Sequence, residues 1–126
     1  MKLLLDTHAF LFWVAGDPRV PRRARAAIEA PRNTVALSAA SVWEMRIKIA
    51  RGSLRVGFAD ICGTARGYGF ALLPIAAEHA ELAGGLPRHH DDPFDRMLIA
   101  QARCEGMTLV TRDGAFSAYG LPLLWE

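Results

Sequence analysis

The chain of 126 residues is 52% hydrophobic and carries a formal net charge of +2. This length suits one compact domain with a real core and is too short for two, so we expect residues 1–126 to form a single domain. The apolar residues occur in runs broken by charge, far short of the roughly 18 consecutive residues of a membrane span, so a membrane protein is excluded and a soluble, cytoplasmic protein is expected.

Short strands and helices are predicted to alternate through the first half of the chain. The apolar run at residues 2–5 predicts a buried strand, and residues 9–14 continue as a helix. A second helix is expected at residues 21–28, because proline is favoured in the first turn of a helix. Residues 34–37 form a second strand, after which a serine caps a helix that extends to about residue 50.

The second half continues this alternation, with expected elements at residues 53–69 (helix), 70–73 (strand), 76–83 (helix), 108–110 (strand), 113 onward (short helix) and 123–124 (strand). The clearest helix follows the loop 89–93, because Phe94, Met97, Leu98 and Gln101 recur on one face before Gly106. This alternation predicts an α/β fold, with a mostly parallel sheet of four to five short strands flanked by helices on both faces.

Four acidic residues occupy positions that such a sheet would bring together. Asp6 follows the first strand, Asp95 lies in the first turn of a helix, and Asp113 follows the strand at residues 108–110. Glu44 lies about two turns into the helix after the second strand. Ligands in open α/β sheets bind beyond the carboxyl ends of the strands, so these side chains are expected to share one pocket.

Crowded carboxylates are costly to keep ionised without a cation, so a shared acidic pocket implies a bound ion. Oxygen ligands without His or Cys partners favour Mg²⁺ or Mn²⁺ over zinc. Such an ion lowers the pKa of a bound water and stabilises the charge that develops on a phosphate under attack, which is the chemistry of metal-assisted hydrolysis.

Each acid also has a simpler interpretation when it is taken alone. Asp6, like Asp113, is placed to cap the helix that follows it, and Asp95 is favoured by the positive end of its helix dipole. A lone helical glutamate such as Glu44 is by default a solvated surface residue. The order and context of all four together favour the shared site.

The sequence resembles the PIN-domain family, and within it the VapC-type toxins of bacterial toxin–antitoxin pairs. The resemblance covers essentially the whole chain, and the segments that carry it are residues 3–9 (LLLDTHA), 38–45 (SAASVWEM), 90–102 (HDDPFDRMLIAQA) and 109–113 (LVTRD). It implies a PIN-like fold and an endoribonuclease that binds Mg²⁺ or Mn²⁺ and hydrolyses single-stranded or looped RNA. The acidic positions of the family motif fall on Asp6, Glu44, Asp95 and Asp113.

The resemblance also implies partners. They are a cognate VapB-type antitoxin, which brings the only contact with DNA and blocks the active site, and a second copy of the chain in a homodimer. The alternatives are a PIN-domain nuclease that processes RNA without an antitoxin, and an inactive PIN-like module that binds RNA or protein. A phosphatase or a nucleotide-binding protein is disfavoured, because the chain has no Asp-x-Asp after its first strand and no glycine-rich phosphate loop.

Four further residues are assigned supporting roles. Thr111 is expected to hold water or a ligand carboxylate, or else to bond its local turn. Asp92 is expected to cap the helix that carries Asp95, although it could also face the pocket. Arg96 and Arg112 are candidates for contacts with RNA phosphates, against the alternative that they are merely solvated. Arginine makes up 13 of the 15 Lys and Arg residues, a bias that suits phosphates and that a GC-rich genome would also produce.

The remaining residues with reactive or aromatic side chains are expected to be structural. The adjacent His89 and His90 are interpreted as surface residues. Cys62 and Cys104 form no Cys-x-x-Cys pair and are expected to be buried free thiols. The tryptophans are assigned to the core or to a subunit interface, because their neighbours are apolar: Trp13, Trp43 and Trp125.

Overall fold

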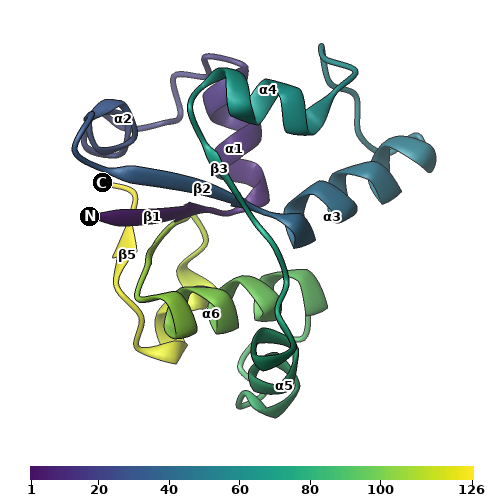
Figure 1. Ribbon diagram of the computed structural model, residues 1–126, viewed down its shortest axis with the longest axis vertical. Helices are drawn as coiled ribbons and strands as arrows, with labels where there is room; N and C mark the ends of the chain where they lie inside the picture. Colours follow the sequence, from purple (N-terminus) through teal and green to yellow (C-terminus); the bar gives the residue numbers. More distant parts are fainter.

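The computed structural model describes residues 1–126, whose five strands form one sheet in the order β3-β2-β1-β4-β5 (Figure 1). Every neighbouring pair of strands is parallel. The strands are β1 (Lys2–Leu5), β2 (Thr34–Ser38), β3 (Ala71–Leu73), β4 (Thr108–Val110) and β5 (Leu123–Leu124). The predicted α/β class with a parallel sheet is therefore confirmed.

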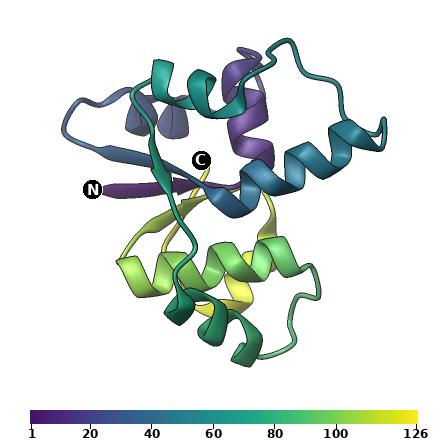
Figure 2. The same ribbon diagram turned by 45° about the vertical axis from the view of Figure 1, so that its right-hand side comes forward.

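Helices cover both faces of this sheet, as the alternation predicts. One face packs against the first four helices and the other against the last two and a 3-10 helix, an arrangement visible in Figures 1 and 2. The helices are α1 (Thr7–Val14), α2 (Arg22–Glu29), α3 (Ala39–Ala50), α4 (Ile61–Gly67), α5 (Ala77–Gly85), α6 (Pro93–Glu105) and η1 (Gly114–Tyr119).

The central strand β1 supplies side chains to both layers of the core. Leu3 and Leu5 point into the cluster formed with α1–α4, and Leu4 points into the cluster formed with α6 and η1. All three side chains are fully buried. A strand covered on both faces has a continuous apolar sequence, which explains why residues 3–5 are all leucine.

The chain adds strands first on one side of β1 and then on the other, so the strand order changes direction between β1 and β4. From β1 the chain adds β2 and then β3 on one side, and it returns to place β4 and β5 on the other side. Loops that leave two such strands turn to opposite faces of the sheet and open a crevice at the carboxyl ends, where α/β proteins bind ligands. The Asp6 amide donates to the Val110 carbonyl at 3.0 Å, so β1 and β4 stay paired up to the edge of this crevice.

The helix expected at residues 53–69 is shorter than predicted. Only residues 61–67 are helical, and Asp60 caps this helix by accepting a hydrogen bond from the Gly63 amide at 2.9 Å. The preceding loop is held by Leu54 and Phe58, which pack against the core as separate anchors. Tertiary packing of two apolar side chains therefore replaces the local helix that the composition favours.

The predicted burial of the two cysteines is wrong in part, and Trp43 lies outside the core, so of its two predicted places only a subunit interface remains. Trp43 is 62% exposed, because α3 buries its opposite face through Ser41, Glu44 and Met45. The other two tryptophans are partly buried against the core. Cys104 is exposed and Cys62 is only half-buried. None of the helices is long and apolar enough to span a membrane.

Candidate active site

Asp6 is held at the carboxyl end of β1 by two hydrogen bonds. Its Oδ1 accepts from the Ala9 amide at 2.7 Å, so it caps α1, and its Oδ2 accepts from the Thr111 hydroxyl at 2.5 Å. The side chain is 5% exposed, and burial raises the pKa of Asp6 despite both hydrogen bonds. Capping is therefore only part of its role, because the second oxygen is fixed by the loop after β4.

Asp95 lies in the first turn of α6, and Asp92 is the N-cap of that helix. The Asp92 carboxylate accepts from the amides of Phe94 and Asp95 at 2.8 and 3.0 Å. Because Asp92 supplies the cap, the carboxylate of Asp95 is free to turn toward the crevice. There burial, and then the charge of Asp92, raise the pKa of Asp95 to about 7. Glu44 and Asp6 raise the same pKa further, which places all these charges close together.

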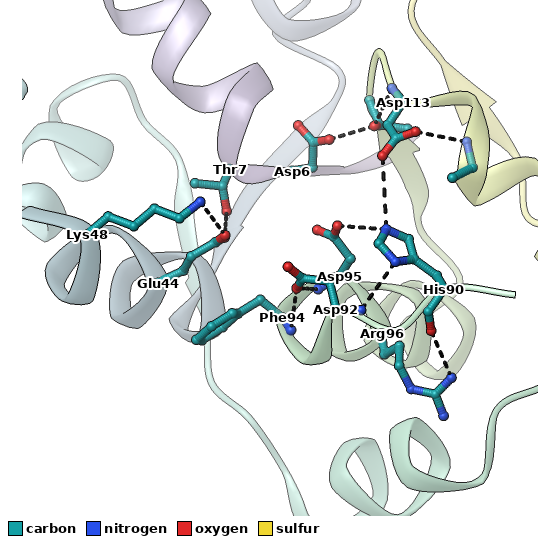
Figure 3. A network of polar contacts seen from close by, with 12 residues as sticks. Asp6, Thr7, Glu44, Lys48, His90, Asp92, Phe94, Asp95, Arg96 and Asp113 are labelled. Carbon is teal, nitrogen blue, oxygen red and sulfur yellow. Dashed lines mark hydrogen bonds and ion pairs between the residues drawn. The ribbon is translucent and has the colours of Figure 1, made fainter. Parts of the chain in front are cut away.

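His90 also lies in this site, although the sequence indicates a surface residue. Its Nδ1 accepts from the Asp92 amide at 3.3 Å, so the neutral ring carries its proton on Nε2. That Nε2 lies 2.9 Å from Asp95 Oδ2 and 4.0 Å from Asp113 Oδ2, without the direction of a good hydrogen bond. His90 is therefore placed between two of the acids (Figure 3).

Asp113 reaches the site from the loop after β4 and is the most exposed of the acids, with 52% of its side chain accessible. Its Oδ1 accepts from the Ala115 amide at 2.9 Å and caps η1. Its own amide donates to the Thr111 hydroxyl oxygen at 3.0 Å. Thr111 thus links the backbone at Asp113 to the carboxylate of Asp6.

Glu44 is buried, so the interpretation of a solvated surface glutamate is wrong. It lies on α3 with 5% exposure, and its Oε1 accepts from the Thr7 hydroxyl at 2.7 Å. The Thr7 oxygen is also 3.0 Å from the Ser41 hydroxyl. The ammonium of Lys48, one turn further along α3, lies 3.0 Å from Glu44 Oε2 and balances its charge. The sequence analysis identified neither Thr7 nor Lys48. For Lys48 a signal was available, because it follows Glu44 by four residues and so lies on the same face of the helix.

The four predicted acids surround one space at the carboxyl edge of the sheet (Figure 3). Candidate ligand atoms of His90, Asp95 and Asp113 all lie within 4.8 Å of one another. A hollow of about 380 Å³ adjoins them, and its lining includes Asp6 and Asp113. Four separate elements therefore deliver carboxylates to the crevice between β1 and β4.

This donor set suits a hard divalent cation. The free donor atoms are carboxylate oxygens, because the His90 nitrogen that faces the acids carries the ring proton, and Mg²⁺ or Mn²⁺ matches such a set better than zinc does. Burial raises the pKa of both Asp6 and Asp95, and neighbouring carboxylates add to this, so a bound cation would favour the charged form of each. The residues present therefore fit a bound divalent ion.

Arg96 does not face the site, so its assignment to RNA phosphates is wrong. Its guanidinium donates to four backbone carbonyls at 2.9–3.2 Å, in the segment from the end of α5 to His90: Ala83, Leu86, Pro87 and His90. The terminal N–H groups of Arg96 are therefore already occupied and are not available to a phosphate. Arg96 therefore fastens the loop that carries His90, whereas Arg112 is exposed and lines the hollow beside Asp113.

Comparison with known proteins agrees with this geometry. The family model of the PIN domain matches residues 3–121, whereas no curated protein sequence matches the chain. The fold is similar to VapBC2 from Rickettsia felis bound to a promoter DNA fragment, at 17% identity and a TM-score of 0.69 over 100% of both chains. FitAB bound to a DNA fragment has 25% identity and a TM-score of 0.61, over 97% of this chain and 93% of that chain. VapC20 of Mycobacterium tuberculosis, a sarcin-ricin loop cleaving toxin, has 20% identity and a TM-score of 0.62 over 98% and 99%.

Proposed function

Because this chain belongs to the PIN-domain family, we propose that it is a metal-dependent endoribonuclease, the toxin of a type II toxin–antitoxin pair. The observation that carries this proposal is the convergence of Asp6, Glu44, Asp95 and Asp113 on one crevice at the reversal of strand order. A non-catalytic module has no need to bury Asp6 and Asp95 where burial and neighbouring carboxylates raise their pKa.

Each acid has a distinct place in the proposed mechanism. Asp6, Glu44 and Asp95 are the proposed ligands of the principal ion, and Asp113 either completes a weaker second site or orients the attacking water. Bound Mg²⁺ or Mn²⁺ supplies an activated water and stabilises the negative charge of the phosphate under attack. Thr111 fixes the orientation of Asp6, and the Thr7 hydroxyl fixes that of Glu44.

Incubation of the purified protein with single-stranded RNA is the test of this activity. Cleavage is expected with Mg²⁺ or Mn²⁺, should stop with EDTA, and should leave 5′-phosphate and 3′-hydroxyl ends, because water and not a ribose hydroxyl is the nucleophile. The ends are identified by their susceptibility to a 5′-phosphate-dependent exonuclease. Cleavage that continues in EDTA, or that leaves 2′,3′-cyclic phosphates, would contradict the proposal. Binding of the ion without cleavage of RNA would indicate an inactive module.

We further propose that a small antitoxin binds beside this site. An apolar groove of about 540 Å³ adjoins α3. It is lined by the exposed Trp43 and by Val42 from α3, and by Leu72 and Leu73 from β3. Similar solved structures include VapBC2 with a DNA fragment from its promoter, FitAB with a DNA fragment, and a toxin–antitoxin complex from Klebsiella pneumoniae. A basic side chain of such a partner would be attracted to the acids next to the groove. The homodimer implied by the family resemblance is part of the same proposal.

Expression of this chain alone is expected to halt growth, and co-expression of a small protein encoded beside it should restore growth.

Trp43→Ser should weaken binding of that protein at least about tenfold, as loss of a central interface tryptophan usually does, without reducing RNA cleavage. Tyr68→Ser is the control, because Tyr68 is also exposed and does not line the groove. Binding is measured by calorimetry. RNA cleavage without growth arrest would instead favour an RNA-processing enzyme.

A further inference from the structure

Two arginines flank one phenylalanine beside the acidic site. The guanidinium carbon of Arg19 lies 4.3 Å from the centre of the Phe12 ring, and that of Arg112 lies 5.5 Å from it. The ring is half-buried and packs against the core, with Trp125 6.4 Å away. Phe12 is therefore a rigid support that holds two cationic side chains by cation–π contacts.

Phe12 also lies where two hollows meet. The hollow of about 380 Å³ that contains Asp6 and Asp113 is lined by His8, Phe12 and Arg112. A second hollow, of about 580 Å³, shares His8 and Phe12 with the first and extends to Arg19 and Arg55. A groove therefore leads from the acids, past His8 and Phe12, to further arginines.

Arg112 is the arginine without an ion pair that lies next to the acids in this groove. Arg19 is bound to Asp17 through contacts of 2.7 and 3.1 Å, and this pairing lowers the pKa of Asp17 to about 2. Arg112 has no carboxylate within 4.0 Å in the structure. Its backbone is fixed, because the Thr111 amide before it donates to the Leu124 carbonyl and the Asp113 amide after it donates to the Thr111 hydroxyl.

We propose that this groove binds the RNA strand on one side of the scissile phosphate, with Arg112 contacting the adjacent phosphate. The inference rests on the proposed ribonuclease activity and names its substrate-binding track. A cation next to the acidic pocket offsets the repulsion that four carboxylates exert on a polyanion. Phe12 acts as a positioning residue for Arg112 through the cation–π contact between them.

The test measures RNA affinity as a function of salt. Binding of a fluorescent single-stranded RNA is followed by anisotropy with Mn²⁺ present, in an Asp95→Asn background that prevents cleavage. Arg112→Gln should weaken binding about tenfold and make the slope of log K against log[KCl] less negative by about 0.7, the value for one lost phosphate contact on a single strand. Phe12→Leu should produce a similar loss, and the double variant should lose little more, because both changes remove the same contact.

The matched control is Arg32→Gln, an exposed arginine that precedes β2 at the opposite edge of the sheet. If Arg112→Gln changes affinity and salt slope no more than Arg32→Gln does, the proposed track is wrong. Loss of antitoxin binding without loss of RNA binding would also overturn it and assign the groove to a protein. A wild-type protein that binds RNA through Arg112 but never cleaves it would retain this inference and refute the ribonuclease proposal.

Discussion

Replacement of Asp95 by asparagine is expected to lower metal-dependent RNA cleavage about a thousandfold and, at the same time, to stabilise the metal-free protein. The loss of activity follows because a bound ion contributes several kcal/mol of transition-state stabilisation and each factor of ten in rate corresponds to about 1.4 kcal/mol. Asp95 is the acid whose pKa responds to the charges of Asp92, Glu44 and Asp6 together, so it is the most central of the proposed ligands.

The gain in stability follows from the pKa of the same group. Asp95 has a pKa of about 7 in the folded protein, against an ordinary value of 3.8, so the folded state binds more protons than the unfolded state between these values. Stability therefore falls as pH rises from about 4 to 7, and at pH 8 the folded protein carries the full cost of a buried, repelled charge. Asparagine has the same shape without the charge, so it removes this cost.

Thermal unfolding in EDTA at pH 5 and pH 8 measures this difference. Asp95→Asn should raise the Tm at pH 8 by several degrees and change it much less at pH 5, where Asp95 is already protonated. Asp60→Asn is the control, because Asp60 is an exposed N-cap on α4, remote from the acids. A variant that unfolds at a lower temperature than wild type at pH 8 would show that Asp95 stabilises the fold, and the electrostatic argument would then be wrong.

The positions of Asp6 and Asp113 follow from the sequence because Asp6 directly follows one short apolar strand and Asp113 lies three residues after the end of another. A parallel sheet brings all such strand ends to one edge, and no knowledge of side-chain packing is required to predict this. The capping roles of Asp6, Asp92 and Asp113 are equally local, since each caps a helix that begins at the next residue. The sequence therefore predicts the edge of the sheet where the acids gather.

The errors concern side chains whose partners lie far away in sequence or that have more than one possible partner. Arg96 has five donors and uses four of them on backbone carbonyls between the end of α5 and His90, and no local pattern predicts this choice. His90 lies in a loop, and its ring is turned toward Asp95 by the anchoring of that loop through Arg96, by the Asp92 amide and by contact with Phe116. Trp43 is exposed because α3 uses its other face for Glu44 and Met45, a choice that its apolar neighbours do not indicate.

The hydroxyl groups around the acids show the same limit. Thr7 directly follows Asp6, yet its hydroxyl bonds to Glu44 on a different helix. Thr111 bonds to Asp6 across 105 positions in the sequence. Each contact needs α1, α3 and the loop after β4 to be packed in their final arrangement. Propensity and spacing therefore predict where these groups lie in the chain, whereas the packed core determines which carboxylate each one holds.

Mn²⁺ is expected to stabilise the wild-type protein strongly at pH 8 and weakly at pH 6. An ion that binds only the folded state at about 100 times its Kd adds about 2.7 kcal/mol to the free energy of unfolding. Below pH 7 the ion must displace a proton from Asp95, whose pKa is about 7. One pH unit below that pKa, the apparent affinity is therefore about tenfold lower, which corresponds to about 1.4 kcal/mol.

Two measurements separate this coupling from a general effect of pH on the fold. The Tm increase caused by Mn²⁺ should grow between pH 6 and pH 8 in wild type, and it should be small and independent of pH in Asp95→Asn. Calorimetry at pH 7 in two buffers with different ionisation enthalpies should detect a release of about half a proton per ion bound, since a group at its pKa is half protonated. Release of no protons, together with pH-independent stabilisation, would show that the ion binds away from Asp95.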